Sequence, residues 1–224
     1  MSGPELGMVH RFLPAPAGQT STRTLLLLHG TGCDESDLLP LGRALDPQAA
    51  LLSPRGNVLE GSMPRFFRRL AEGVFDIEDL TRRTHELAAF VSSATSAYGR
   101  DPAGVVAVGF SNGANIAGSL LLLHPGTLRA AALLRPMVPI EPDPLPDLHG
   151  TSVLVAAGRA DPIVPRSESE RLRALLERCG AEVEVSSADA GHGLTQADIG
   201  TVKAWLGRLS AAGVAPVPGG PQAA

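Results

Sequence analysis

Continuous apolar runs that end at or near glycine or proline constrain the fold of this 224-residue sequence more than any other feature. The runs show no alternation of polar and apolar residues, a pattern typical of strands that are buried on both faces. They are TRTLLLLHG, AALLSPRG, GVVAVGF, AAALLRP and TSVLVAAG. Stretches that favour helices separate most of them. Strands that alternate with helices predict an α/β fold with a doubly wound, mostly parallel sheet and helices on both faces.

The helical stretches and the chain end complete this organisation. The predicted helices are ESDLLPLGRAL, DIEDLTRRTHELAAFVSSATSAYG, ANIAGSLLLLHP, SESERLRALLERCG and TQADIGTVKAWLGRL, and AEVEVSS is a further strand. The stretch MPRFFRRLAEGVF fits neither pattern. No internal repeat or linker is visible, so residues 1–210 are expected to form a single domain. Residues 211–224 are rich in Pro, Gly and Ala and are predicted to be disordered.

Charge and cysteine content disfavour several classes of protein. The formal net charge is −4 without a block of like charges, which disfavours binding to nucleic acid. Two cysteines, without a CxxC pair or a Cys/His cluster, predict neither a disulfide framework nor a metal site, and they favour a reduced, cytoplasmic compartment. The N-terminal stretch lacks the apolar core of a secretory signal, and the longest apolar runs are too short to span a membrane.

The motif GFSNG, from Gly109 to Gly113, carries the strongest functional signal. Its serine, Ser111, stands where an apolar strand is followed by a helix. A glycine lies two positions before it and another two positions after it. One interpretation is an ordinary tight turn. The other is a nucleophile on a strained turn, with the N–H of Asn112 directed at a developing oxyanion. The strand before the motif and the helix after it favour the nucleophile.

A serine nucleophile needs a base, and in this arrangement the base follows the serine in the chain. Three histidines come after Ser111. His124 closes the helix that starts at the serine, so it is expected to lie far from the hydroxyl. His149 precedes the strand that is expected to carry the acid. His192, in DAGHGL, follows the last strand and is predicted to be the base; the alternative is a surface loop histidine.

The acid that orients the base is expected between the nucleophile and His192. Asp161, in GRADPIVP, follows a strand end on the same edge as the serine and is predicted to be this acid. Its alternative role is that of a turn or N-cap aspartate. Asp189 is the competitor, but it lies only 192 − 189 = 3 positions before the histidine. Asp143 and Asp147 lie in a proline-rich loop before the strand and rank lower.

The loop HGTG after the first apolar run offers the second oxyanion donor, the backbone N–H of Thr31. His29 opens this loop. Its place at a strand end favours a structural role, in which it holds the loop by hydrogen bonds, over a role as the base.

Together, LLLLHGTGCDESDL, SPRGNVLEGSMPRFF, GFSNGANIA, GRADPIVP and AGHGL resemble the phospholipase/carboxylesterase family of α/β hydrolases, which includes enzymes similar to acyl-protein thioesterases. The resemblance extends over nearly the whole chain. It implies a minimal α/β-hydrolase fold without a large lid domain, and a serine esterase without metal or cofactor. It places the triad at Ser111, Asp161 and His192, and the oxyanion donors at Thr31 and Asn112.

The resemblance also gives expectations for the substrate. It implies that the segment from Arg55 to Phe75 helps to line the substrate pocket, with Arg55, Met63, Phe66 and Phe67 as candidates, although aromatic residues at this spacing are equally typical of a core. The family commonly has glycine where this chain has Cys33, which we interpret as a small buried residue.

The expected function is therefore a carboxylesterase that acts on small or short-to-medium-chain esters through an acyl-enzyme. An alternative within the enzyme class is a thioesterase for acyl-proteins or acyl-CoA, or a lysophospholipase. An alternative from another class is a non-catalytic ligand-binding protein on a hydrolase fold. The expected partner is a small ester, and the assembly is left open between a monomer and a homodimer.

Overall fold

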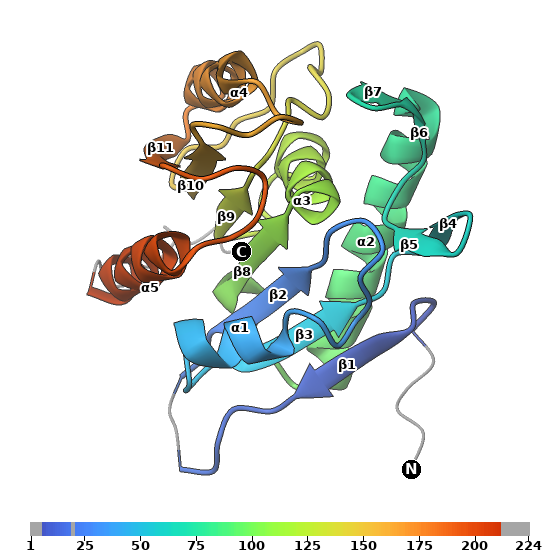
Figure 1. Cartoon of the computed structure of the whole chain (residues 1–224). Helices are drawn as coiled ribbons and strands as arrows, with labels where there is room; N and C mark the ends of the chain where they lie inside the picture. Colours follow the sequence, from blue (N-terminus) through green and yellow to red (C-terminus); the bar gives the residue numbers. More distant parts are fainter. Residues whose placement is uncertain (1–5, 19–20, 212–224) are drawn as a thin grey trace, which may run out of the picture.

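Seven strands form the central sheet of the computed structural model, which describes residues 6–18 and 21–211. Their order is β1-β3-β2-β8-β9-β10-β11 (Figure 1). All neighbours pair in parallel except β1 with β3, so the mostly parallel α/β sheet predicted from the apolar runs is confirmed. The strands are β1 (His10–Leu13), β2 (Thr24–Leu28), β3 (Ala50–Pro54), β8 (Val105–Phe110), β9 (Ala130–Leu134), β10 (Ser152–Gly158) and β11 (Glu182–Ala188).

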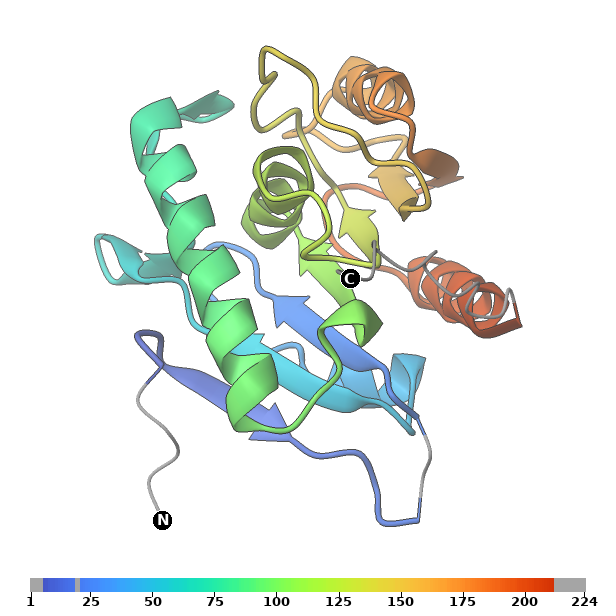
Figure 2. The ribbon, with the colours of Figure 1, turned by 180° about the vertical axis from the view of Figure 1, so that it is seen from behind.

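Helices cover both faces of the sheet because side chains of a strand point alternately to either side. In β2, Leu26 and Leu28 pack towards α2, α3 and α4, whereas Leu25 and Leu27 pack towards α1 and α5. Figure 1 shows α1 and α5 in front of the sheet, and Figure 2 shows α2 and α3 in front of it from behind. The helices are α1 (Leu39–Leu45), α2 (Ile77–Ala97), α3 (Asn112–Leu123), α4 (Arg166–Arg178) and α5 (Gln196–Ala211), with a short 3₁₀ helix η1 (Pro102–Gly104).

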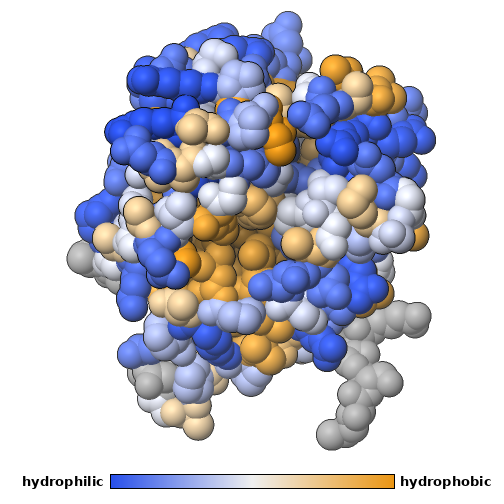
Figure 3. Space-filling model, viewed as in Figure 1, coloured by the Kyte–Doolittle hydropathy of each residue, from blue (hydrophilic) through white to orange (hydrophobic). Residues whose placement is uncertain are grey.

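The face that carries α1 and α5 is covered only in part. In Figure 3, which has the view of Figure 1, apolar side chains gather in a hollow in the middle of this face, and polar residues surround it. Leu41, Phe110, Leu194 and Ile199 are partly buried residues that pack against the core on this side. Two helices with a gap between them therefore leave part of the apolar layer accessible.

Several elements differ from the sequence prediction. The edge strand β1 has no counterpart in the predicted set, and it pairs antiparallel with β3. The stretch that fits neither pattern contributes to two small hairpins, which are β4 (Val58–Glu60) with β5 (Met63–Arg65) and β6 (Arg69–Ala71) with β7 (Val74–Phe75). Helix α1 begins only at Leu39, with Pro40 in its first turn, so the predicted helix from Glu35 is too long.

The predictions for residues 211–224 and for membrane spans stand as follows. The disorder predicted for residues 211–224 falls, apart from residue 211, outside the residues that the structure describes. Among the described residues, no helix combines the length and apolar character that a membrane span requires.

Candidate active site

Ser111 stands on a strained turn between β8 and α3. Its φ angle is 53°, in the left-handed region that a residue with a side chain rarely adopts, and such strain costs ~1–3 kcal/mol. The two glycines of the motif are required by space. A Cβ on Gly109 would lie 2.4 Å from the carbonyl oxygen of Gly113, and a Cβ on Gly113 would lie 1.9 Å from that of Leu28. A turn this crowded lifts the hydroxyl above the carboxyl edge of the sheet.

His192 bridges Ser111 and Asp161, although the three residues are far apart in the sequence. Its Nε2 lies 2.9 Å from Oγ of Ser111, and its Nδ1 lies 2.8 Å from Oδ2 of Asp161. A carboxylate only accepts hydrogen bonds, so Nδ1 carries the proton and Nε2 is free to accept the hydroxyl proton. The structure therefore brings together the three side chains that the sequence predicts, in the order of contacts that a nucleophile, base and acid require.

The carboxylate of Asp161 is buried and held in place from two sides. Its side chain is only 1% exposed, and Oδ1 accepts the backbone N–H groups of Ile163 and Val164 at 2.8 and 3.0 Å. Burial raises the pKa of Asp161, but these N–H groups and His192 together outweigh burial and bring the pKa below its ordinary value of 3.8. Asp161 is consequently ionised at neutral pH, and Oδ2 is left to orient the imidazole.

None of the alternative residues reaches Ser111. The side chain of Asp189 is 83% exposed and pairs with Arg159. Nε2 of His124 lies 2.7 Å from Nδ1 of His85, beyond the far end of α3. His149 pairs with Asp147 at the surface. The remaining aspartate in the proline-rich loop, at position 143, is exposed.

The backbone N–H groups of Thr31 and Asn112 are available for an oxyanion. Both residues and Ser111 line one cavity. Within the described part of the chain, neither N–H donates to an acceptor. Asn112 is also the first residue of α3, where the helix dipole favours negative charge. The arrangement fits stabilisation of a tetrahedral intermediate.

The segment around β5 holds both of these donors. Arg65 Nη1 donates to Oγ1 of Thr31 at 2.7 Å, and the N–H of Gly32 donates to the carbonyl of Pro64 at 3.0 Å. The N–H of Phe66 donates to Oδ1 of Asn112 at 2.8 Å. Sequence reasoning missed Arg65, because its segment matches no periodic pattern and its partners lie far away in the chain.

His29 has the structural place that the sequence predicts. It is fully buried, its Nδ1–H donates to the carbonyl of Gly30 at 2.7 Å, and its Nε2 accepts the N–H of Gly56 at 3.0 Å. Burial lowers the pKa of His29, so the ring is neutral at physiological pH. A neutral ring is also what the two bonds require, since a second ring proton would oppose the Gly56 N–H.

We expect His29 to make the stability of the protein depend on pH. A lowered pKa means that the unfolded chain binds the proton more tightly than the folded chain does. The contribution of neutral His29 to the free energy of unfolding is therefore fully present above the unfolded pKa of about 6.5. It is lost as the pH falls from there through the lowered pKa. Wild type should therefore have a larger free energy of unfolding than His29→Asn at pH 8, and this difference should be smaller at pH 5. A His149→Asn variant controls for removal of an exposed imidazole, and a difference that stays constant with pH contradicts the account.

The cavity at Ser111 is small, with a volume of about 40 Å³. Its apolar wall includes Phe75, Met137, Ile163 and Val164. A buried water needs about 10–15 Å³ when volume is measured with a water-sized probe, so the cavity has room for a group of a few heavy atoms.

The segment from Arg55 to Phe75 does help to line this cavity, through Arg65, Arg69, Glu72, Gly73 and Phe75. The four candidates that the sequence suggests within it do not line the cavity, which requires a correction. Phe66 and Phe67 are 3% and 0% exposed and belong to the core between the sheet and α2, so their aromatic character serves packing. Arg55 donates to both carboxylate oxygens of Glu35. Met63 is 42% exposed on its hairpin and lies outside the cavity.

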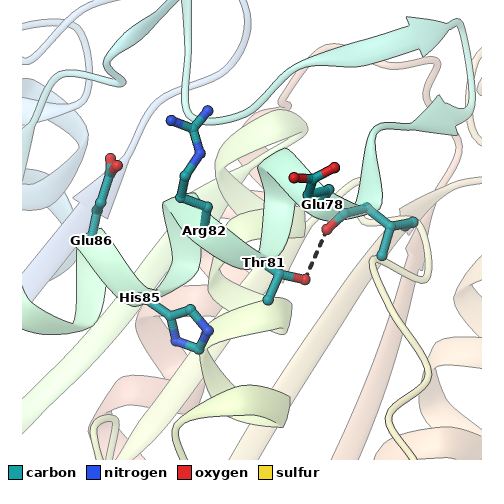
Figure 4. A pocket seen from close by; sticks show the side chains of 6 residues that line it. Glu78, Thr81, Arg82, His85 and Glu86 are labelled. Carbon is teal, nitrogen blue, oxygen red and sulfur yellow. Dashed lines mark hydrogen bonds between the residues drawn. The ribbon is translucent and has the colours of Figure 1, made fainter.

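A larger hollow of about 650 Å³ lies on the surface of α2. Figure 4 shows its lining side chains, which all project from this one helix, and the hydrogen bond from the hydroxyl of Thr81 to the carbonyl of Ile77. The lining residues are Ile77, Glu78, Thr81, Arg82, His85 and Glu86. The hydroxyl of Thr81 donates to its own helix, and Nδ1 of His85 pairs with Nε2 of His124, so neither forms a nucleophile–base pair with the other.

Neither a metal centre nor a reactive thiol is visible in residues 6–18 and 21–211. No group of three or more His, Cys, Asp and Glu side chains there could hold a metal ion. Cys33 is half-buried rather than fully buried, and burial together with Asp37 and Asp34 raises the pKa of its thiol. Cys33 therefore stays protonated at neutral pH and is a poor nucleophile.

Known proteins with similar sequences are hydrolases. The pattern of the dienelactone hydrolase family matches residues 67–204. MhqD of Bacillus subtilis (strain 168), a provisionally assigned hydrolase, is 50% identical over 186 residues, which cover 83% of this chain and 93% of that protein.

Two solved carboxylesterases share the fold. The Bacillus cereus carboxylesterase has a TM-score of 0.87 and 49% identity, over 90% of this chain and 94% of its own. The carboxylesterase from Mesorhizobium loti has a TM-score of 0.80 and 38% identity, over 85% and 91% of the two chains. These similarities confirm the α/β-hydrolase fold and the resemblance to esterases that the sequence motifs indicate.

Proposed function

Because the chain belongs to the dienelactone hydrolase family and is a hydrolase of the esterase type, we propose that it is a serine carboxylesterase for small carboxylic esters. The observation that carries the proposal is the pair of contacts of His192, at 2.9 Å to Ser111 and 2.8 Å to Asp161. A binding protein has no need for an imidazole held between a strained serine and a buried carboxylate.

The proposed acylation assigns a role to each residue of the site. Oγ of Ser111 attacks the ester carbonyl carbon, and its proton passes to Nε2 of His192. Asp161 keeps the ring in the required orientation and stabilises the imidazolium. The oxyanion of the tetrahedral intermediate accepts the N–H groups of Thr31 and Asn112. The imidazolium then gives its proton to the alkoxy oxygen, the C–O bond breaks, and the alcohol leaves an acyl group on Ser111.

Deacylation repeats these steps with water. A water molecule attacks the acyl carbonyl and gives a proton to His192, which returns it to Oγ of Ser111 as the carboxylic acid leaves. All bonds and protons balance with the ester and water as the only reactants.

The size of the cavity predicts a preference for short acyl chains. With p-nitrophenyl esters from acetyl to octanoyl, kcat/KM should be highest for the shortest chains. Met137→Ala should shift the preference towards longer chains, because each methylene that the enlarged cavity accepts contributes ~0.8 kcal/mol, or about fourfold in kcat/KM. We expect the ratio of hexanoyl to acetyl activity to rise about tenfold or more.

The matched control is Met63→Ala, which removes an exposed methionine outside the cavity and should leave the ratio unchanged. A wild-type optimum at long chains, or a ratio that Met137→Ala does not move, would contradict the proposed substrate size. Thioesters of the same acyl groups belong in the panel, since the proposed steps apply equally to a C–S bond. The cytoplasmic location stays a prediction, and the assembly stays open between a monomer and a homodimer.

A further inference from the structure

Arg135 is a buried arginine that directly follows β9 and lies beneath the loop of His192. Its side chain is 0% exposed, which is costly for a permanent charge unless the charge is paired. Its φ angle of 57° lies in the left-handed region, where a long side chain is disfavoured. Two unfavourable features at one residue indicate that the contacts of its side chain hold it there.

Every N–H group of the Arg135 guanidinium has an acceptor. Nη1 and Nη2 donate to the two carboxylate oxygens of Asp198 at 3.0 and 2.8 Å, and Nη1 also donates to the carbonyl of Ala156 at 3.2 Å. Nε donates to the carbonyl of Gly191 at 3.1 Å, and Nη2 donates to that of Gly193 at 3.1 Å. An arginine side chain has five donors, so none remains unused.

The carbonyl groups of Gly191 and Gly193 belong to the two residues that flank His192 in the chain. Within the described residues, the backbone of 191–194 makes no hydrogen bond to another backbone group. Neither steric crowding nor a positive φ angle at its glycines restrains the loop. A Cβ on Gly191 would come no closer than 3.7 Å to a neighbour, a Cβ on Gly193 would meet nothing within 4 Å, and neither has a positive φ. Glycine is the most flexible residue, so such a loop needs an external restraint.

We propose that Arg135 is a positioning residue that fixes the backbone on both sides of His192 and so holds the imidazole between Ser111 and Asp161. This inference rests on the proposed esterase function, because it assigns a role within the same site. Asp198, near the start of α5, orients the guanidinium through the two-oxygen contact and also accepts the N–H and hydroxyl of Thr195 at 2.8 Å. Arg135 thereby ties the loop to β10 and α5.

The planar fork of arginine is essential to this role. A lysine ammonium has three donors at one point and cannot reach a carboxylate and three carbonyls in these directions. Arg135→Lys keeps the charge but releases the loop. We expect kcat to fall about 10- to 100-fold with KM changed less than about threefold, because misplacement of a catalytic group by about 1 Å costs up to about 10²-fold.

The matched control is Arg100→Lys. Arg100 also bonds carbonyl groups, those of Ser21 and Arg23, and the hydroxyl of Thr24, but these lie at the opposite, amino end of β2. The control should lower stability without a comparable loss of kcat. A second variant, Arg135→Met with Asp198→Leu, removes the buried charges together, which is often neutral for stability. It should fold, and it should show the same loss of kcat.

A proton NMR signal separates positioning from general damage. In the folded wild type, the Nδ1–H of His192 bonded to Asp161 should give a strongly downfield resonance, which Arg100→Lys keeps and Arg135→Lys loses. The signal needs no substrate, so it tests the role of Arg135 even if the wild type cleaves no ester and the proposed function fails. The wild type offers one more readout, because the guanidinium protons of Arg135 should exchange slowly with solvent.

Three results would overturn the proposal. One is a folded Arg135 variant that keeps the resonance and loses no more kcat than Arg100→Lys. Another is a loss that appears only in KM. The third, which needs no variant at all, is exchange of the Arg135 guanidinium protons as fast as that of an exposed arginine.

Discussion

Replacement of Ser111 by alanine should lower kcat by about 10⁴-fold or more on an activated ester, with the protein still folded. Alanine keeps the Cβ and therefore the same strained turn, so the fold should not change. It removes only the oxygen that lies 2.9 Å from Nε2 of His192. The measurement is single-turnover and steady-state hydrolysis of p-nitrophenyl acetate, with circular dichroism to verify the fold.

Ser92→Ala, on the exposed face of α2, is the matched control and should retain wild-type kcat. Retention of even a tenth of wild-type kcat by the purified, folded Ser111→Ala protein would show that another group is the nucleophile.

The second large effect concerns the acid. Asp161→Asn should lower kcat by about 10³- to 10⁴-fold, because an amide in contact with Nδ1 no longer favours the tautomer in which Nε2 accepts a proton. The same substitution at Asp189 removes an exposed pair with Arg159 and should change kcat by less than about twofold. The two variants differ only in position, so their ranking tests the assignment directly.

Both proteins should be compared under conditions in which each is folded, since Asp161 also accepts two backbone N–H groups. If Asp189→Asn caused the greater loss of kcat, the role of the acid would pass to Asp189.

The sequence predicts the sheet and the triad for related physical reasons. Strands buried on both faces must be apolar throughout, and the runs around Leu25–Leu28 and Val105–Val108 have this property. Parallel strands bring their carboxyl ends to one edge, so residues that follow different strands meet there. Ser111, Asp161 and His192 each follow a strand end, which is why three positions far apart in the chain could be predicted together.

Other features depend on partners that no local pattern reveals. Strand β1 is only four residues long and forms through its pairing with β3. Arg65 reaches a residue 34 positions away, and Arg135 reaches one 63 positions away. Spacing alone also cannot separate a core aromatic from a pocket aromatic, so both roles remain open for Phe66 and Phe67 at the level of the sequence. In the structure both rings are buried in the core, where Phe66 contacts His29 and Phe67 contacts Phe75.

The most direct test of the serine mechanism is covalent labelling. Wild-type protein treated with a fluorophosphonate should gain one adduct, and peptide mass spectrometry should place it on Ser111. Ser111→Ala should gain none, and His192→Ala should react at least about 10²-fold more slowly, since the hydroxyl then lacks its base. An active wild-type esterase that gains no adduct, or gains it at a residue other than Ser111, would contradict the account.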